Sequence, residues 1–150
     1  MDWLTPSSLL CWSIIIYLAA AIVAINFYRH PHLCTLLAQS GCIFASVLSA
    51  ASAFSLLISG KEKLIIVPFK STIPFISIGM TLDSLSAFFI LILSIIVCCV
   101  SIYSIGYLKH YYYKRNVSTF HALYIGFILS MMFVFTAGNA VFFFMAWEIT

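Results

Sequence analysis

The chain has 150 residues, of which 64% are hydrophobic and 7% are charged, and its formal net charge is +3. A soluble domain has roughly 45–50% apolar and 25% charged residues, so this chain lacks the polar surface that a water-soluble globule needs. Its seven basic residues are spread along the chain rather than clustered, which excludes the basic face of a nucleic-acid-binding protein. Together with the mean hydropathy of +1.15, the composition indicates a membrane protein.

The first apolar segment covers residues 9–27, and crossing a bilayer takes about 20 such residues. The residues before it include Asp2 but no base, and the nearest positive charge, Arg29, follows the segment. A signal peptide has the opposite arrangement, with a positive region first. We therefore predict a transmembrane helix that enters from the non-cytoplasmic side.

The second predicted span covers residues 33–58. Gly41, Ala45, Ser49 and Ala53 recur at every fourth position in it. Small residues at this spacing lie on one helix face and allow close approach between helices in lipid, where apolar burial provides little driving force. We predict a packed helix face here, although alanine and serine are also simply common residues.

Residues 61–82 differ from the apolar segments on either side. Pro68 and Pro74 exclude a continuous helix. Residues 76–83 alternate strictly between apolar and polar side chains, which is the pattern of a strand with one apolar face. Residues 64–67 provide a possible partner strand. We predict a β-hairpin that rests on helix ends or on a partner subunit, because an isolated hairpin is marginally stable in water.

Two further spans and part of a third follow. Asp83 is placed to cap a span over residues 85–108, and the next span covers residues 117–137. A turn at residues 138–139 leads into an apolar segment over residues 140–150. The predicted fold is an all-α membrane protein with four transmembrane helices, a truncated fifth helix and a short extracytoplasmic β-hairpin between helices 2 and 3. We expect residues 1–150 to form a single transmembrane domain.

Basic residues in the loops predict the orientation, because cytoplasmic loops are enriched in lysine and arginine. The first and third loops carry Arg29, Lys109, Lys114 and Arg115. The hairpin loop carries Lys61, Lys63 and Lys70. This small excess and the base-free amino terminus place the first and third loops in the cytoplasm, and we expect a multi-pass protein of the inner (cytoplasmic) membrane.

Most features of enzyme chemistry are missing from the sequence. It has no glycine-rich phosphate loop, no CxxC motif and no paired carboxylates. The four histidines fall in predicted loops or at helix starts, where a structural or interfacial role explains them better than metal binding. The five cysteines lack zinc-ligand spacing, so we interpret them as small helix-packing residues. We predict no catalytic residue, no metal site and no cofactor.

Glu148 is the one acidic residue within an apolar segment. It is the ninth residue of that segment, counted from Ala140. At about 1.5 Å per residue it reaches roughly 13 Å into a hydrocarbon core about 30 Å thick. A carboxylate at that depth is costly unless it is protonated, hydrated or paired, and such residues usually mark ion or proton pathways. From the residues alone, an equally good interpretation is a surface glutamate on a short segment that never inserts.

Several short sequences resemble one family of membrane proteins. In chain order these are LDSLSAFF at residues 82–89, YSIGYL at 103–108, SMM at 130–132, NA at 139–140 and AWE at 146–148. In order and spacing they resemble the amino-terminal part of the antiporter-like membrane subunits of energy-converting complexes. That group includes NADH-quinone oxidoreductase chain 5, and residues 103–108 resemble most the hydrogenase-4 component B and formate hydrogenlyase type.

The resemblance implies a long subunit in which Glu148 is the key proton-translocating glutamate of the fifth helix. In the family this glutamate works with a lysine two helices further on, and the chain has no such residue after Glu148. We therefore expect a truncated amino-terminal portion or one piece of a split subunit, not competent for transport alone. Its partners would be the lipid bilayer and other membrane subunits of a hydrogenase or quinone oxidoreductase complex.

Two hypotheses from other classes remain open. One is a complete four-helix membrane scaffold or assembly protein without transport activity. The other is a small self-assembling exporter, although such proteins usually carry their acid in the first span, and this first span has none.

Overall fold

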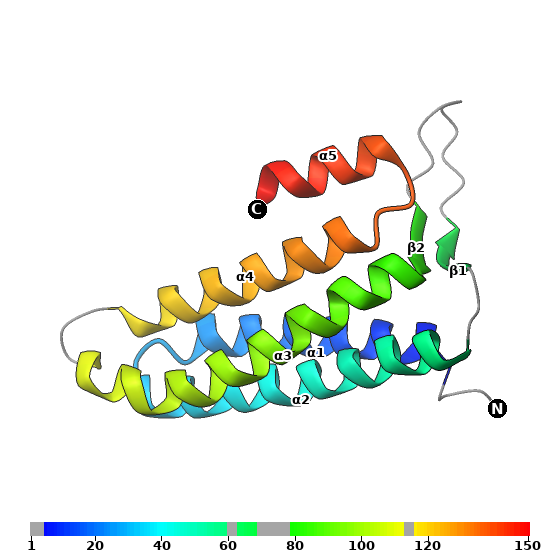
Figure 1. Cartoon of the computed structure of the whole chain (residues 1–150). Coiled ribbons are helices and arrows are strands. Elements are labelled where there is room, and N and C mark those ends of the chain that lie inside the picture. Colours follow the sequence, from blue (N-terminus) through cyan, green and yellow to red (C-terminus); the bar gives the residue numbers. More distant parts are fainter. Residues whose placement is uncertain (1–4, 60–62, 69–78, 113–115) are drawn as a thin grey trace.

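A computed structural model describes residues 5–59, 63–68, 79–112 and 116–150. In this part of the chain, four helices are long and apolar enough to cross a membrane. They are α1 (Pro6–Asn26), α2 (Pro31–Ser59), α3 (Ser84–Tyr107) and α4 (Val117–Phe135), and a short 3₁₀ helix, η1 (Leu108–Tyr111), continues α3. Each begins and ends within about one turn of a predicted span. Figure 1 shows them side by side as a bundle.

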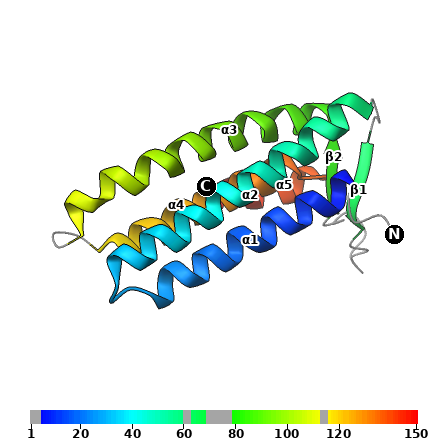
Figure 2. The ribbon, with the colours of Figure 1, turned by 90° about the horizontal axis from the view of Figure 1, so that it is seen from below.

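The second helix is central to the bundle. It contacts α1, α3 and α4, and Figure 2 shows it lying between α1 and α3. The connection between α1 and α2 lies at the same end of the bundle as η1, whereas the start of α1 lies at the opposite end (Figure 1). The fifth helix, α5 (Ala140–Ile149), runs back along the outside of α4.

Polar side chains cap three of these helices. Thr5 accepts a hydrogen bond from the Ser8 amide at the start of α1 (3.4 Å). Asp83 accepts one from the Ser86 amide at the start of α3 (2.7 Å). Asn139 accepts one from the Val141 amide at the start of α5 (3.3 Å). The first amides of a helix have no partner within it, so these caps determine where each helix begins. The predicted Asp83 cap is confirmed.

Two short strands lie at the end of the bundle where α3 begins. Strand β1 (Lys63–Pro68) pairs antiparallel with β2 (Gly79–Asp83), with Leu64 opposite Leu82. The Thr81 amide also donates to the Thr136 carbonyl just after α4 (2.8 Å). The strand pair is therefore joined to the helices through β2. The predicted strand residues 76–78 and the connecting turn lie outside the described residues, and the hairpin and its side of the membrane remain predictions.

Small residues pack α2 into the bundle. Ala45, Ser49 and Ala53 are fully buried. A Cβ built on Gly41 would lie 3.1 Å from the Ala20 Cβ of α1, so α1 and α2 approach closely at this glycine. The small-residue face predicted for α2 is confirmed, and it serves as a helix-packing surface.

Polar and apolar residues are distributed in the manner of a membrane protein. Large apolar side chains such as Ile58 and Leu123, each 70% exposed, cover the outside of the bundle. Several hydroxyl side chains are buried within it, and Ser13, Ser46 and Ser94 each donate to a backbone carbonyl of their own helix. Local bonds of this kind satisfy hydroxyl groups away from water. An apolar exterior of this size requires a lipid environment, and the chain is a multi-pass membrane protein.

Candidate proton-binding site

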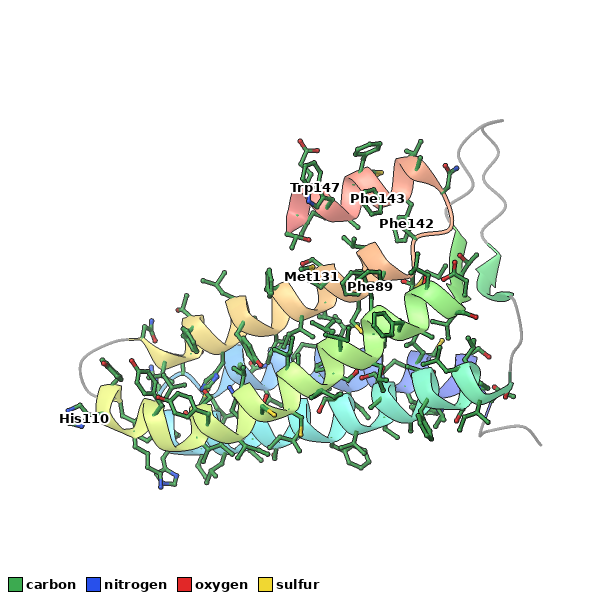
Figure 3. The ribbon with its side chains drawn as sticks, in the orientation of Figure 1. Phe89, His110, Met131, Phe142, Phe143 and Trp147 are labelled. Carbon is green, nitrogen blue, oxygen red and sulfur yellow. The ribbon has the colours of Figure 1, made fainter. Side chains whose placement is uncertain are left out.

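The short helix α5 positions Glu148. Ala146 is buried in the contact with α4, and the Phe133 and Phe142 rings meet edge to face with centroids 6.3 Å apart. Figure 3 shows Phe142 on the side of α5 that faces α4. Glu148 is exposed, as is its neighbour Trp147. The contacts between α5 and α4 thus leave Glu148 exposed, without cover from the other described helices.

The basic residues Arg29 and Lys109 lie far from the start of α5, whereas Lys63 begins β1 at the strand end of the bundle. Arg29 follows α1 and Lys109 lies in η1, both at the end of the bundle opposite the strands (Figure 1). The start of α5, in contrast, is at the strand end. Any cation that pairs with Glu148 must therefore come from outside these two connections. The part of Glu148 in proton translocation remains a prediction.

A buried polar cluster connects α2, α3 and α4 near the end of the bundle that contains η1. The Gln39 Nε2 of α2 lies 2.8 Å from the His121 Nδ1 of α4 and 3.3 Å from the Ser104 Oγ of α3. The His121 Nε2 lies 3.1 Å from the Thr35 Oγ1. Gln39, His121 and Thr35 are fully buried, and Ser104 is nearly so. The arrangement can hold and exchange hydrogen-bonding protons in the interior of the bundle.

The hydrogen bonds of this cluster assign its donors and acceptors. The Thr35 hydroxyl donates its one hydrogen to the Pro31 carbonyl (2.9 Å), so it can only accept from His121. Nε2 of His121 is then the protonated ring nitrogen, and Nδ1 accepts from the Gln39 amide. His121 is held as a neutral imidazole. Gln39 Oε1 is buried without a hydrogen-bond partner among the described residues.

This cluster was not predicted from the sequence. His121 does fall near a helix start, as predicted, but it points into the bundle, whereas His30, His32 and His110 are exposed. Half of the cluster could have been predicted from the sequence, because Thr35 and Gln39 are four residues apart and therefore lie on one face of a helix. The partner residues on α3 and α4 were not evident, since 65 and 82 positions separate Gln39 from Ser104 and His121.

Within the described ranges, the structure contains no group of three or more histidine, cysteine, aspartate or glutamate side chains able to hold a metal ion. The cysteines there are free thiols. Cys34 and Cys42 are buried in α2, and the Cys34 thiol donates to the Ala24 carbonyl of α1 (3.5 Å). These two thiols belong to the packing between α1 and α2.

Comparisons with known proteins agree with the resemblance in the sequence. The model of the family described as NADH-ubiquinone oxidoreductase (complex I), chain 5 N-terminus matches residues 75–121. Hydrogenase-4 component B of Escherichia coli (strain K12) is 28% identical over 140 residues, or 93% of this chain. The chain is similar to the N-terminal part of an antiporter-like membrane subunit. It spans about a fifth of the length of hydrogenase-4 component B, since the match covers 20% of that protein.

The family match covers α3 and the segments on either side of it. Residues 75–121 include β2, all of α3, η1 and the first turn of α4. Asp83, Ser104 and His121 therefore lie within the region that is similar to the antiporter-like subunits. Two of these residues, Ser104 and His121, belong to the buried polar cluster.

Proposed function

We propose that the chain provides the first helices of a proton-translocating antiporter-like subunit in a membrane-bound hydrogenase or NADH-quinone oxidoreductase-type complex. The observation that carries the proposal is the similarity to hydrogenase-4 component B over 140 residues, which extends across nearly the whole bundle. The match to the family model over residues 75–121 agrees with it. Other membrane subunits of the complex are the expected partners.

Within this function, Glu148 is the proposed proton-binding carboxylate. It lies at the ninth position counted from the first residue of α5, at a depth of about 13 Å if α5 crosses the membrane along its axis. A charged side chain at the centre of a membrane helix costs about 2.5–3.5 kcal/mol on the insertion scale, so it needs a partner. Glu148 is exposed on α5, which leaves room for a basic residue from another helix.

The proposed placement in the membrane follows from the two ends of the bundle. The end with Arg29 and Lys109 faces the cytoplasm, and the end with β1 and β2 faces away from it, where the strands form an extracytoplasmic hairpin. The more basic loops support this orientation. We place the whole chain, as one transmembrane domain, in the inner (cytoplasmic) membrane.

A chimera tests the function. The stretch of hydrogenase-4 component B that aligns with this chain is replaced by residues 1–150, and proton uptake is measured in inverted membrane vesicles. We expect the chimera to join its complex and to support uptake. Glu148→Gln should reduce uptake at least tenfold, because an amide cannot release a proton at this position. Glu148→Asp should retain part of it.

The matched control is Glu62→Gln, which removes the other glutamate of the chain. It should leave uptake unchanged. Equal uptake by the chimera and its Glu148→Gln variant would refute the role of Glu148. A chimera that assembles the complex but supports no uptake would favour the scaffold or assembly function.

A further inference from the structure

The buried cluster of Thr35, Gln39, Ser104 and His121 has the geometry of a second proton-binding site. We propose that His121 binds a proton at Nδ1 and that the Gln39 carboxamide turns over to accept the new N–H bond. The site is separate from Glu148, and the inference stands on the hydrogen bonds of the cluster. It shares with the proposed function only the passage of protons through the chain.

The neutral state defines which atom takes the proton. His121 Nε2 already carries hydrogen, because the Thr35 hydroxyl that it contacts donates to the Pro31 carbonyl. Nδ1 therefore has the free electron pair, 2.8 Å from the Gln39 Nε2 that donates to it. Protonation breaks an O–H bond of a hydronium ion and forms an N–H bond at Nδ1. A water molecule and an imidazolium result.

The protonated state needs an acceptor at Nδ1, and Gln39 contains one. The amide nitrogen of Gln39 faces both His121 and Ser104, while its Oε1 is buried without a partner among the described residues. Turning the carboxamide by half a revolution exchanges the two atoms. Oε1 then accepts from Nδ1, and the Ser104 hydroxyl can donate to it. A buried acceptor without a donor is unfavourable, so the unpaired oxygen favours this exchange once the proton arrives.

The surroundings of His121 provide dipoles rather than a counter-ion. None of the buried polar side chains among the described residues is an aspartate, glutamate, lysine or arginine. The buried or half-buried thiols and phenols on the four long helices are Cys11, Tyr17, Cys34, Cys42, Cys98 and Tyr124. Side chains of both types are ordinarily uncharged at neutral pH. The charge of the imidazolium would therefore be stabilised by the Gln39 oxygen, which makes Gln39 a positioning residue with a measurable effect.

The position of the cluster suits exchange with water at one membrane surface. Thr35 and His121 each lie four residues after the first residue of their helix, α2 and α4. At 1.5 Å per residue this is about 6 Å from the helix start. Ser104 lies three residues before the end of α3, at the same end of the bundle. A proton that enters from the loop side would therefore reach His121 after about one helix turn, without crossing the apolar centre.

Nitrogen-15 NMR of histidine side chains tests the proposal on the full chain in lipid nanodiscs. His30→Asn, His32→Asn and His110→Asn leave His121 as the only histidine. At high pH we expect the neutral tautomer with hydrogen on Nε2, and on acidification the imidazolium with hydrogen on both ring nitrogens. A neutral His121 at every pH at which the chain keeps its helical circular dichroism would overturn the proposal.

Variants at position 39 test the part played by the carboxamide. Gln39→Met keeps the length of the side chain without the oxygen acceptor. At equal pH, the ratio of imidazolium to neutral His121 should fall at least about tenfold, because a hydrogen bond to a charged group is lost. Gln39→Glu should raise the ratio, because it places a carboxylate acceptor beside the imidazolium. If the methionine variant does not fold, this variant tests the role of position 39 by itself. Ser40→Met, at an exposed neighbouring position, is the control and should leave the ratio unchanged. Equal ratios in all variants would refute the role of Gln39, and no result at position 39 depends on Glu148.

Discussion

The two residues proposed to bind protons differ in how the bundle places them. Glu148 is exposed on α5, whereas His121 is fully buried between α2 and α4 and holds two hydrogen bonds. The Glu148 carboxylate is not covered by the described helices, whereas both ring nitrogens of His121 have hydrogen-bond partners within the bundle. A residue's own chemistry therefore does not predict whether this chain alone supplies its partners.

The first prediction concerns Glu148 in the isolated chain. The purified 150-residue chain in liposomes under an imposed pH gradient should pass protons no faster than empty liposomes. The reason is that the described helices place no basic side chain beside an exposed carboxylate at this position. Glu148→Gln should leave the flux unchanged. A flux that the intact chain shows and Glu148→Gln abolishes would make this chain a transporter on its own.

Asp83 provides a residue-scale test of stability. It caps α3 by accepting from the Ser86 amide at 2.7 Å. Asp83→Ala should lower the free energy of unfolding by about 1 kcal/mol, the usual effect of losing such a cap. Asp83→Asn should retain most of it, because asparagine caps helices about as well. Titration with a denaturing detergent, followed by circular dichroism, measures the difference, and equal losses in both variants would contradict the capping role.

At the scale of elements, the closeness of α1 and α2 depends on residues without bulk. Gly41 lets the backbone of α2 approach Ala20 of α1, and the buried alanines and serines continue the same face. Lipid does not drive apolar surfaces together as water does, so close backbone contact is one of the main sources of association. The position of α2 among three other helices follows from this face.

Enlarging Gly41 should separate these helices. A Cβ there would lie 3.1 Å from the Ala20 Cβ, and the further methyl groups of valine have less room still. Gly41→Val should lower the free energy of unfolding by about 1–3 kcal/mol, the range for overpacked contacts. Gly106→Val is the matched control, because nothing lies within 4 Å of a Cβ built on Gly106 in α3. Detergent-induced unfolding of both variants makes the comparison, and equal losses would show that helix propensity, not packing, explains the effect.

At the scale of the whole molecule, the bundle has two distinct ends. The loop end has η1 and the α1–α2 connection, and the strand end has β1, β2 and the start of α5 (Figure 1). The buried polar cluster lies near the loop end, and α5 begins at the strand end. In a membrane these ends face opposite sides, so a test of orientation also assigns the side on which His121 exchanges protons.

We predict that the strand end faces away from the cytoplasm. Single cysteines at positions 63 and 70, in a chain whose own five cysteines are replaced, should react with a membrane-impermeant thiol reagent added to intact cells. Cysteines at positions 112 and 114 should react only after the membrane is opened. The excess of basic residues in the first and third loops is the physical basis. The reverse labelling pattern would invert the orientation.

The sequence alone determined the features that depend on neighbours along the chain. Helix number and approximate ends followed from the length of the apolar segments, because an apolar segment must span the hydrocarbon core as a hydrogen-bonded helix. The Asp83 cap and the small-residue face of α2 followed in the same way, since a cap lies within one turn and a helix face repeats every three to four residues.

Only the tertiary structure decided which segments meet. It joined β2 to the end of α4, placed α5 on the outside of α4, and brought Thr35, Gln39 and His121 into one buried cluster. Hydropathy marks which helices enter the membrane and says little about their lateral arrangement, because the outer faces of all of them are apolar. That arrangement depends on close contacts and polar pairs between helices that are distant in the sequence.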